Sequence, residues 1–321
     1  MAKEFIWDES SVQVYTKDYG TQKLTPYQHD SLGPFWKDPG ADFTMDAEGE
    51  ILTLVVAGVD GDENNIWWPS EGMTGSPLNM NIINGNLVLY YEKNNTLRNS
   101  GIYFGNNTAP LYLTLNNSAR LDIISCPFVF FSKFGGFKLA MSGSSHFNIE
   151  SSTTQEAGML NIISGAFNLT DSASFSYEFP DEHAGYKAAL LSFLATVSGN
   201  AKMTFTDNTA TTSKLEFASG DENGAKFNIN GDNARLAFMA KGHPLFGEKE
   251  IAGMNKGTFN FITKGIVNNS EIVLQNAGKD EMNAFWKTGA IAIDDQPQYD
   301  DKNLNFDYDD ALPGLRISVK H

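Results

Sequence analysis

Three aspartate pairs near the C-terminal end are the residues whose types and spacing could most directly perform chemistry. They are Asp294-Asp295, Asp300-Asp301 and Asp309-Asp310, with Gly242-His243-Pro244 before them and Arg316 after them. Carboxylates that converge beside a histidine or an arginine could protonate a glycosidic oxygen and hold an acidic sugar. The sequence therefore allows a polysaccharide-active enzyme, a hydrolase or a lyase, as one hypothesis.

The context of these aspartates differs from the polygalacturonase pattern. Proline follows His243 where that pattern has glycine, and the aspartate pairs come after the histidine instead of before it. A solvated acidic tail is the alternative interpretation of the pairs, and we prefer it.

Metal-ligating residues do not fall at the spacings that metal sites require. The tetrapeptide Gly-Asp-Glu-Asn occurs at 61–64 and at 220–223 and could offer oxygens to calcium, but neither copy has the calcium-loop spacing with a downstream glutamate. The five histidines and Cys126 show no zinc-ligand spacing. Phosphate-loop, dinucleotide-binding and nucleophile-elbow motifs are also absent, so we predict no metal and no cofactor.

Tryptophans in polar, Pro/Gly-rich surroundings are the remaining candidates for a binding site. Trp36, Trp67 and Trp68 could stack on sugar rings or anchor a protein partner. Packing within a terminal cap is the alternative role for these rings. We predict these three residues as the binding site.

Short strands must position all of these groups. Apolar and polar residues alternate over a few positions, as in Phe147-Asn148-Ile149, Phe167-Asn168-Leu169 and Phe227-Asn228-Ile229, which is strand periodicity. Turn formers such as Ser142-Gly143-Ser144-Ser145 separate these segments. First apolar positions at 203, 215, 227 and 236, and wider gaps elsewhere, predict coils of about 20–25 residues with two or three faces.

This pattern favours an all-β, right-handed parallel β-solenoid over a β-sandwich or jelly roll. The strands are short for a sandwich, and phenylalanines recur at positions where they could stack from coil to coil. The Asn-rich turns suit left-handed corners and ladders of side-chain amides.

Two segments also resemble the degenerate repeats of autotransporter passenger and adhesin-type β-helices. They run from Ser164 to Phe175 and from Gly224 to Leu236, and the likeness extends over roughly residues 80–275. The resemblance implies the fold strongly and the function weakly. From the sequence we expect neither the signal peptide nor the C-terminal membrane-barrel translocator of that family, which leaves the secretion route open.

The two ends differ from the repetitive middle. We expect an aromatic- and acid-rich N-terminal cap over residues 1–75, solenoid repeats over 76–275, and a C-terminal cap with an acidic tail over 276–321. Within the last segment we expect a short helix at 279–287 and a final strand at 315–319. Residues 188–195 fit either a helix or a buried strand.

The composition limits the classes of partner that we expect for this protein. The net charge of −16 repels phosphate backbones, which excludes nucleic acid, and no apolar run is long enough to span a membrane. Cys126, the single cysteine, lies in an apolar run, and we expect a buried, inert thiol.

Our leading hypothesis is a non-enzymatic, adhesin-like surface or secreted protein that recognises a glycan or protein receptor. The alternatives are a polysaccharide-active β-helix enzyme and a secreted effector or toxin that acts through a protein receptor. We expect an extracellular or cell-surface location, with the cytoplasm as the alternative.

Overall fold

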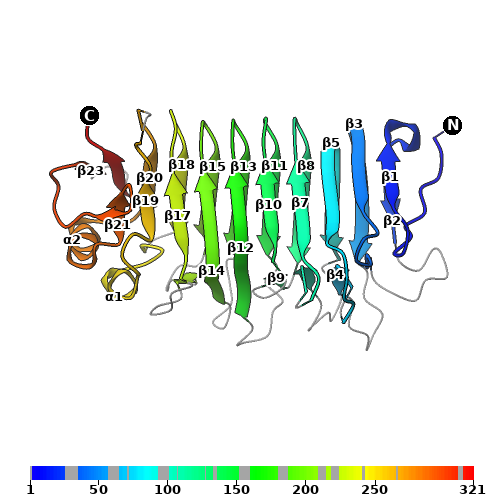
Figure 1. The fold of residues 1–321 in the computed structure, drawn as a ribbon, viewed down its shortest axis with the longest axis horizontal. Coiled ribbons are helices and arrows are strands. Elements are labelled where there is room, and N and C mark those ends of the chain that lie inside the picture. Colours follow the sequence, from blue (N-terminus) through cyan, green and yellow to red (C-terminus); the bar gives the residue numbers. More distant parts are fainter. Residues whose placement is uncertain are drawn as a thin grey trace.

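The computed structural model shows a parallel β-solenoid of about seven turns whose coils stack along one axis, as the sequence predicted (Figure 1). It describes residues 2–25, 35–56, 65–70, 72–92, 101–106, 108–126, 128–132, 136–151, 160–179, 187–208, 215–217, 224–240, 243–264, 267–309 and 314–321. Among these residues, no helix is both long and apolar enough to cross a membrane.

Three ladders of parallel strands form the three faces of the solenoid. Ladder A contains β1 (Gln13–Thr16), the first parts of β3 (Phe43–Val56) and β5 (Leu78–Tyr91), β7 (Leu111–Leu115), β10 (Lys138–Met141), the second parts of β12 (Leu160–Leu169) and β14 (Lys187–Val197), β17 (Lys226–Ile229), β19 (Phe259–Phe261) and β21 (Ile291–Ile293).

Ladder B follows ladder A along the chain, and ladder C completes each coil. Ladder B contains β2 (Gln22–Leu24), the second parts of β3 and β5, β8 (Arg120–Cys126), β11 (His146–Ser151), β13 (Ser174–Phe179), β15 (Lys202–Asp207), β18 (Arg235–Ala240) and β20 (Glu271–Gln275). Ladder C contains β4 (Ile66–Trp68), β6 (Ile102–Phe104), β9 (Val129–Phe131), the first parts of β12 and β14, and β16 (Leu215–Phe217).

The coils are longer than the sequence pattern predicted. Leu113 pairs with Leu139, and Leu139 pairs with Phe167, so these coils span 26 and 28 residues. Phe227 pairs with Phe259 and Phe259 with Ile291, which gives 32 residues each. The strands β4, β6 and β9 of ladder C have only three residues, so strand alternation gives little signal for the third face of a coil.

Inward side chains stack from coil to coil, which confirms the predicted phenylalanine stacks. Phe205 and Phe238 face each other with ring centroids 5.5 Å apart and planes 9° from parallel. Phe227 stacks on Phe259 in the same way at 5.4 Å. These rings are almost completely buried, so each adds apolar burial and an aromatic contact to the core.

Left-handed residues occupy the same corner, between ladders A and B, in five successive coils. Asn117, Gly143, Asp171, Gly199 and Gly231 all have positive φ angles there, from 49° to 115°. Backbone bonds tie each corner to the next, such as the Ser144 N–H to the Asn117 carbonyl at 2.6 Å. The predicted left-handed corners are therefore confirmed.

Amide ladders are also present on the outside of the coils, as predicted. Asn260 Nδ2 donates to Asn228 Oδ1 at 3.0 Å, and Asn233 Nδ2 donates to Asn200 Oδ1 at 2.9 Å. These bonds link neighbouring coils through side chains as well as through the backbone.

At the N-terminal end, aromatic side chains close the first coil. Phe5 contacts Tyr15 and Tyr19 edge to face, and η1 (Lys17–Tyr19) joins β1 to β2. Buried Lys37 donates to the carbonyls of Asp8 and Ser11 at 2.7 and 2.9 Å. Parallel pairing already begins at β1, so stacked coils extend into the range expected to be a cap.

At the C-terminal end, antiparallel strands and two helices cover the last coil. β24 (Gly314–Val319) pairs antiparallel with β20 and with β23 (Leu304–Asp309), which ends the parallel ladder. α1 (Glu248–Ala252) and α2 (Lys279–Thr288) lie at this end, and Phe285 of α2 contacts Phe259. The expected helix and final strand are confirmed, whereas residues 188–195 lie in strand β14.

Candidate functional site

The first aspartate pair forms a tight turn. Asp294 and Asp295, with φ angles of 49° and 63°, connect β21 to β22 (Gln296–Pro297) in a two-residue hairpin. Asp294 accepts hydrogen bonds from Thr263 N and Oγ1 at 2.9 and 2.6 Å, and these bonds lower its pKa. Asp295 accepts from Lys226 Nζ at 2.7 Å. Both carboxylates are therefore used as structural acceptors, and the lowered pKa makes Asp294 unsuited to donate a proton.

The structure describes only part of the other two aspartate pairs. Asp300 accepts from the Lys302 N–H at 3.1 Å in an exposed turn. Asp310 and both Gly-Asp-Glu-Asn copies lie outside the described residues. Within the described part of the chain, no group of three or more His, Cys, Asp or Glu side chains could hold a metal ion.

The three predicted tryptophans have different environments. Trp68 is fully buried, and its Nε1 donates to the Phe35 carbonyl at 3.0 Å. It packs in the core, so it offers no surface to a ligand. Trp36 is 37% exposed, and its Nε1 donates to the Asn65 carbonyl at 3.0 Å.

Trp67 points outward from ladder C and begins a row of aromatic rings. Its ring lies on Tyr103 of the next coil, with centroids 3.7 Å apart and planes 8° from parallel. Tyr103 in turn contacts Phe130 at 5.7 Å and Phe128 at 5.6 Å. All four side chains are partly exposed. We call Trp67, Tyr103, Phe128 and Phe130 the aromatic row.

Strand alternation explains why these rings share one side. In β4, β6 and β9 the first and third residues are buried and the middle residue is partly exposed. The strand register aligns the middle residues Trp67, Tyr103 and Phe130. Trp36 lies near the start of the row, because the N–H of the following Lys37 donates to the Trp67 carbonyl at 3.1 Å.

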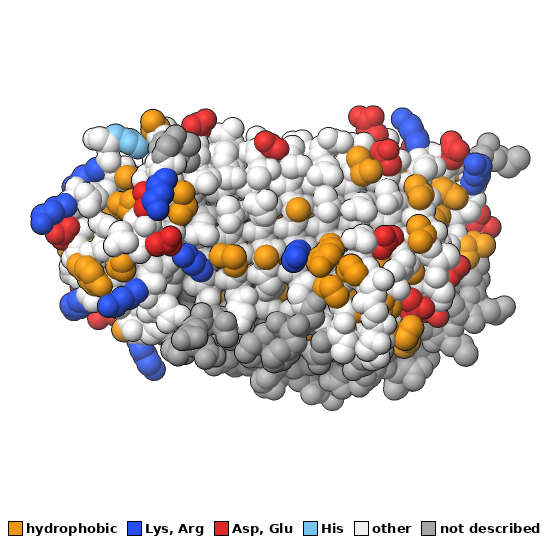
Figure 2. Space-filling view, viewed as in Figure 1, with side chains coloured by type: hydrophobic (Ala, Val, Ile, Leu, Met, Phe, Trp, Pro, Cys, Tyr) orange, Lys and Arg blue, Asp and Glu red, His pale blue; other side chains and the backbone are white. Residues whose placement is uncertain are grey.

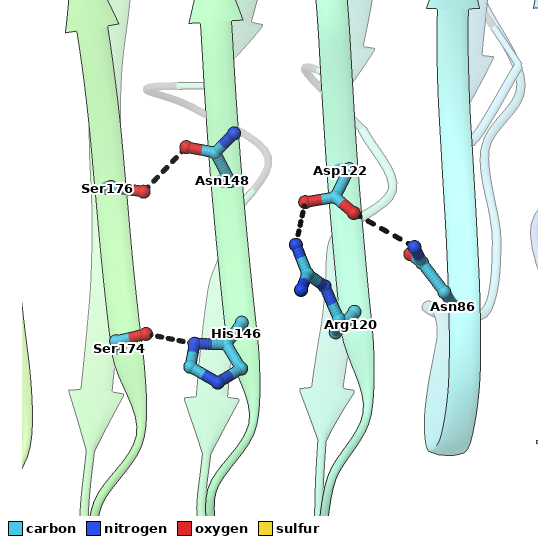
Figure 3. Close-up of polar contacts among 7 residues, drawn as sticks. All are labelled: Asn86, Arg120, Asp122, His146, Asn148, Ser174 and Ser176. Carbon is cyan, nitrogen blue, oxygen red and sulfur yellow. Dashed lines mark hydrogen bonds and ion pairs between the residues drawn. The ribbon is translucent and has the colours of Figure 1, made fainter. Parts of the chain in front are cut away.

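A second group of outward side chains lies on ladder B in three separate hydrogen-bonded sets (Figure 3). Asp122 is only 6% exposed and accepts from Asn86 Nδ2 at 3.0 Å and from Arg120 Nη2 at 3.2 Å. On the next two strands, His146 Nδ1 bonds to the Ser174 hydroxyl, and Ser176 donates to Asn148 Oδ1 at 2.6 Å. We call the seven residues of Figure 3 the polar network.

The polar network lacks the connections of a catalytic triad. Asp122 bonds to Arg120 and Asn86, and neither bond orients the ring of His146, as a triad would require. Burial and the charge of Arg120 lower the pKa of His146, which keeps its imidazole neutral near pH 7. The arrangement is therefore suited to hold polar groups in fixed positions on a surface.

Charged side chains gather toward the two ends of the face seen in Figure 2 and are few over its middle coils. Outward positions of ladder A include Tyr112, Lys138 and Leu194, and Lys138 Nζ lies 4.8 Å from the Tyr112 ring centroid. Tyr112 and Lys138 lie on a different ladder from both candidate surfaces.

Fold and surface together place this chain in the class of parallel β-solenoids, with an aromatic row on one face and a polar network on another. Comparison with protein-family models, with curated proteins and with solved structures returns no match. The resemblance to adhesin-type β-helices therefore holds at the level of the fold.

Proposed function

We propose that this protein is a non-catalytic, adhesin-like binding protein that recognises a glycan, and that sugar rings stack on the aromatic row. The observation that supports this most is the coplanar Trp67–Tyr103 pair, which is partly exposed on the outside of the solenoid. Apolar C–H faces of sugars pack well on aromatic rings, and the polar edges of both groups stay in water.

Rigidity also supports this proposal. Trp67 and Tyr103 are attached to paired strands, and each ring restricts the rotation of the other. Because little side-chain freedom remains to be lost, a ligand that covers the pair avoids part of the entropy cost of binding. Such a site would suit an extracellular or cell-surface protein that must hold a polymer.

The molecule has two candidate binding surfaces, and the carboxylates described above serve structural roles. We therefore favour binding over hydrolysis. Asp294 and Asp295 shape a turn, and Asp122 holds Arg120 and Asn86. A protein receptor is an alternative ligand for the same aromatic row.

A glycan-array screen tests the proposal. The wild-type protein should bind a subset of glycans without releasing products, and Trp67→Ala and Tyr103→Ala should each weaken that binding. Loss of an aromatic anchor removes about 2 kcal/mol, or roughly thirtyfold in affinity.

Tyr112→Ala is the matched control, because Tyr112 is a partly exposed outward tyrosine on ladder A. It should bind as the wild type does. Product release from a bound glycan would make the protein an enzyme. Binding that survives Trp67→Ala and Tyr103→Ala would contradict the proposed site, and a complete lack of glycan binding would contradict the proposed ligand.

A further inference from the structure

Four basic side chains share one outward register of ladder B. Arg120 lies opposite His146, His146 opposite Ser174, Ser174 opposite Lys202, and Lys202 opposite Arg235. We call Arg120, His146, Lys202 and Arg235 the cationic row. The row is notable because the chain as a whole carries a net charge of −16.

Strand spacing sets the geometry of the row. Neighbouring strands of a sheet lie about 4.8 Å apart, so the row extends over four spacings, or about 19 Å, parallel to the solenoid axis. Ser174 stands at the one position between His146 and Lys202 that lacks a basic residue. The charge of the row comes from Arg120, Lys202 and Arg235, because the imidazole of His146 is neutral near pH 7. A line of spaced positive groups matches an extended, repeating anion better than a compact one.

Two carboxylates hold the arginines at the ends of the row. Arg120 pairs with Asp122 at 3.2 Å, and Asp122 is fixed in turn by Asn86. Arg235 pairs with Glu271 at 3.3 Å. Both guanidinium groups keep further N–H donors that can point toward a ligand.

Among the described residues of β11 and β13, the acidic side chains lie at a distance from the row. Glu150 and Glu178 are four residues further along their strands than His146 and Ser174, or about 13 Å. This distance exceeds the Debye length of about 8 Å at physiological salt. The side chain of Lys202 is exposed, and its ammonium group makes no ion pair or hydrogen bond within the described residues. The row therefore keeps a local positive potential.

We infer that the cationic row binds a linear anionic polysaccharide that lies along the solenoid axis. This inference does not depend on the aromatic row, which occupies a different ladder. The outward neighbours of the row are Asn148, Ser176 and Thr204, whose amide and hydroxyl groups can bond to sugar hydroxyls. Aromatic side chains that would stack on nucleic-acid bases are absent from the two outward registers that these residues occupy on β8, β11, β13 and β15.

The test measures binding of dextran sulfate and of polygalacturonate at 0.15 M salt, with uncharged dextran as the neutral probe. Dextran sulfate carries sulfates and polygalacturonate carries carboxylates, so the two arms identify the anionic group. Lys202→Glu should weaken binding by about tenfold or more, because it places a negative charge in the middle of the row.

Lys138→Glu makes the same change of net charge on ladder A and should change affinity by less than about twofold. Trp67→Ala should leave dextran sulfate binding intact, which separates this inference from the proposed aromatic site. Equal weakening by Lys202→Glu and Lys138→Glu would overturn the inference, as would the absence of binding to both anionic polymers. Equal binding of uncharged dextran or of single-stranded DNA would also overturn it.

Discussion

Adding one methyl group to the corner between ladders A and B should weaken the solenoid strongly, and Gly143→Ala is the variant that does so. Gly143 has a φ angle of 67° and stacks on Asn117, the corner residue of the preceding coil. A Cβ at Gly143 would lie 2.7 Å from the Asn117 carbonyl oxygen and 2.9 Å from its Cα. These are backbone atoms, so relief requires the two coils to separate.

Two costs add up to the expected effect. The left-handed backbone costs a residue with a Cβ about 1–2 kcal/mol. Overlap with neighbouring backbone adds about 1–3 kcal/mol. We therefore expect Gly143→Ala to lower the free energy of unfolding by about 2–5 kcal/mol.

Gly49→Ala is the control, because Gly49 also has a positive φ angle, 82°, but a Cβ there would meet nothing within 4 Å. Gly49→Ala should lower the free energy of unfolding only by the cost of the left-handed backbone, about 1–2 kcal/mol. Urea unfolding followed by circular dichroism gives both values, and amide exchange of Ser144 and His146 reports the local opening. Equal stability of the two variants would refute close stacking of the corners.

Three further predictions follow from burial and charge. Burial raises the pKa of Cys126 to about 12, so its thiol should resist iodoacetamide at pH 8 until the protein unfolds, and rapid labelling of native protein would contradict this. Burial and the charge of Arg120 lower the pKa of His146 from 6.5, partly opposed by Asp122, so the unfolded chain binds more protons as the pH falls below 6.5. Stability should therefore fall on acidification through that window, and His146→Gln should reduce the change in urea midpoint between pH 7 and 5. Trp68→Ala should cost about 3–5 kcal/mol of stability because the ring is fully buried, and a stability near wild type would contradict its placement in the core.

The sequence predicted the fold well because residues of the same type return at equivalent positions. Phe147 lies opposite Phe175 on the next coil of ladder B, Phe227 lies opposite Phe259 on the next coil of ladder A, and Gly143 and Gly199 mark equivalent corners. The coil length was predicted too short, because the three-residue strands β4, β6 and β9 of ladder C show little of the alternation on which the prediction relied.

The candidate site was predicted only in part. Trp67 and Trp68 are adjacent, so strand alternation sends one outward and the other into the core, and composition alone does not decide which. A usable signal was present in the sequence, because β4, β6 and β9 each consist of an aliphatic residue followed by two aromatic residues. That repeat identifies the middle residues, Tyr103 and Phe130 among them, as one outward row.

The sequence contains no comparable repeat that would have identified the polar network or the cationic row. Arg120, His146 and Lys202 differ in type and are separated by 26 residues or more, so only the strand register brings them together. A register of this kind depends on the coil lengths, which the sequence pattern did not define.

The most direct test of the proposed function is the affinity of wild type, Trp67→Ala and Tyr112→Ala for the best ligand from the glycan array, measured by titration calorimetry. We predict that Trp67→Ala loses roughly thirtyfold in affinity and that Tyr112→Ala binds as the wild type does. Equal affinities for all three proteins would contradict the assignment of the aromatic row as the glycan-binding site.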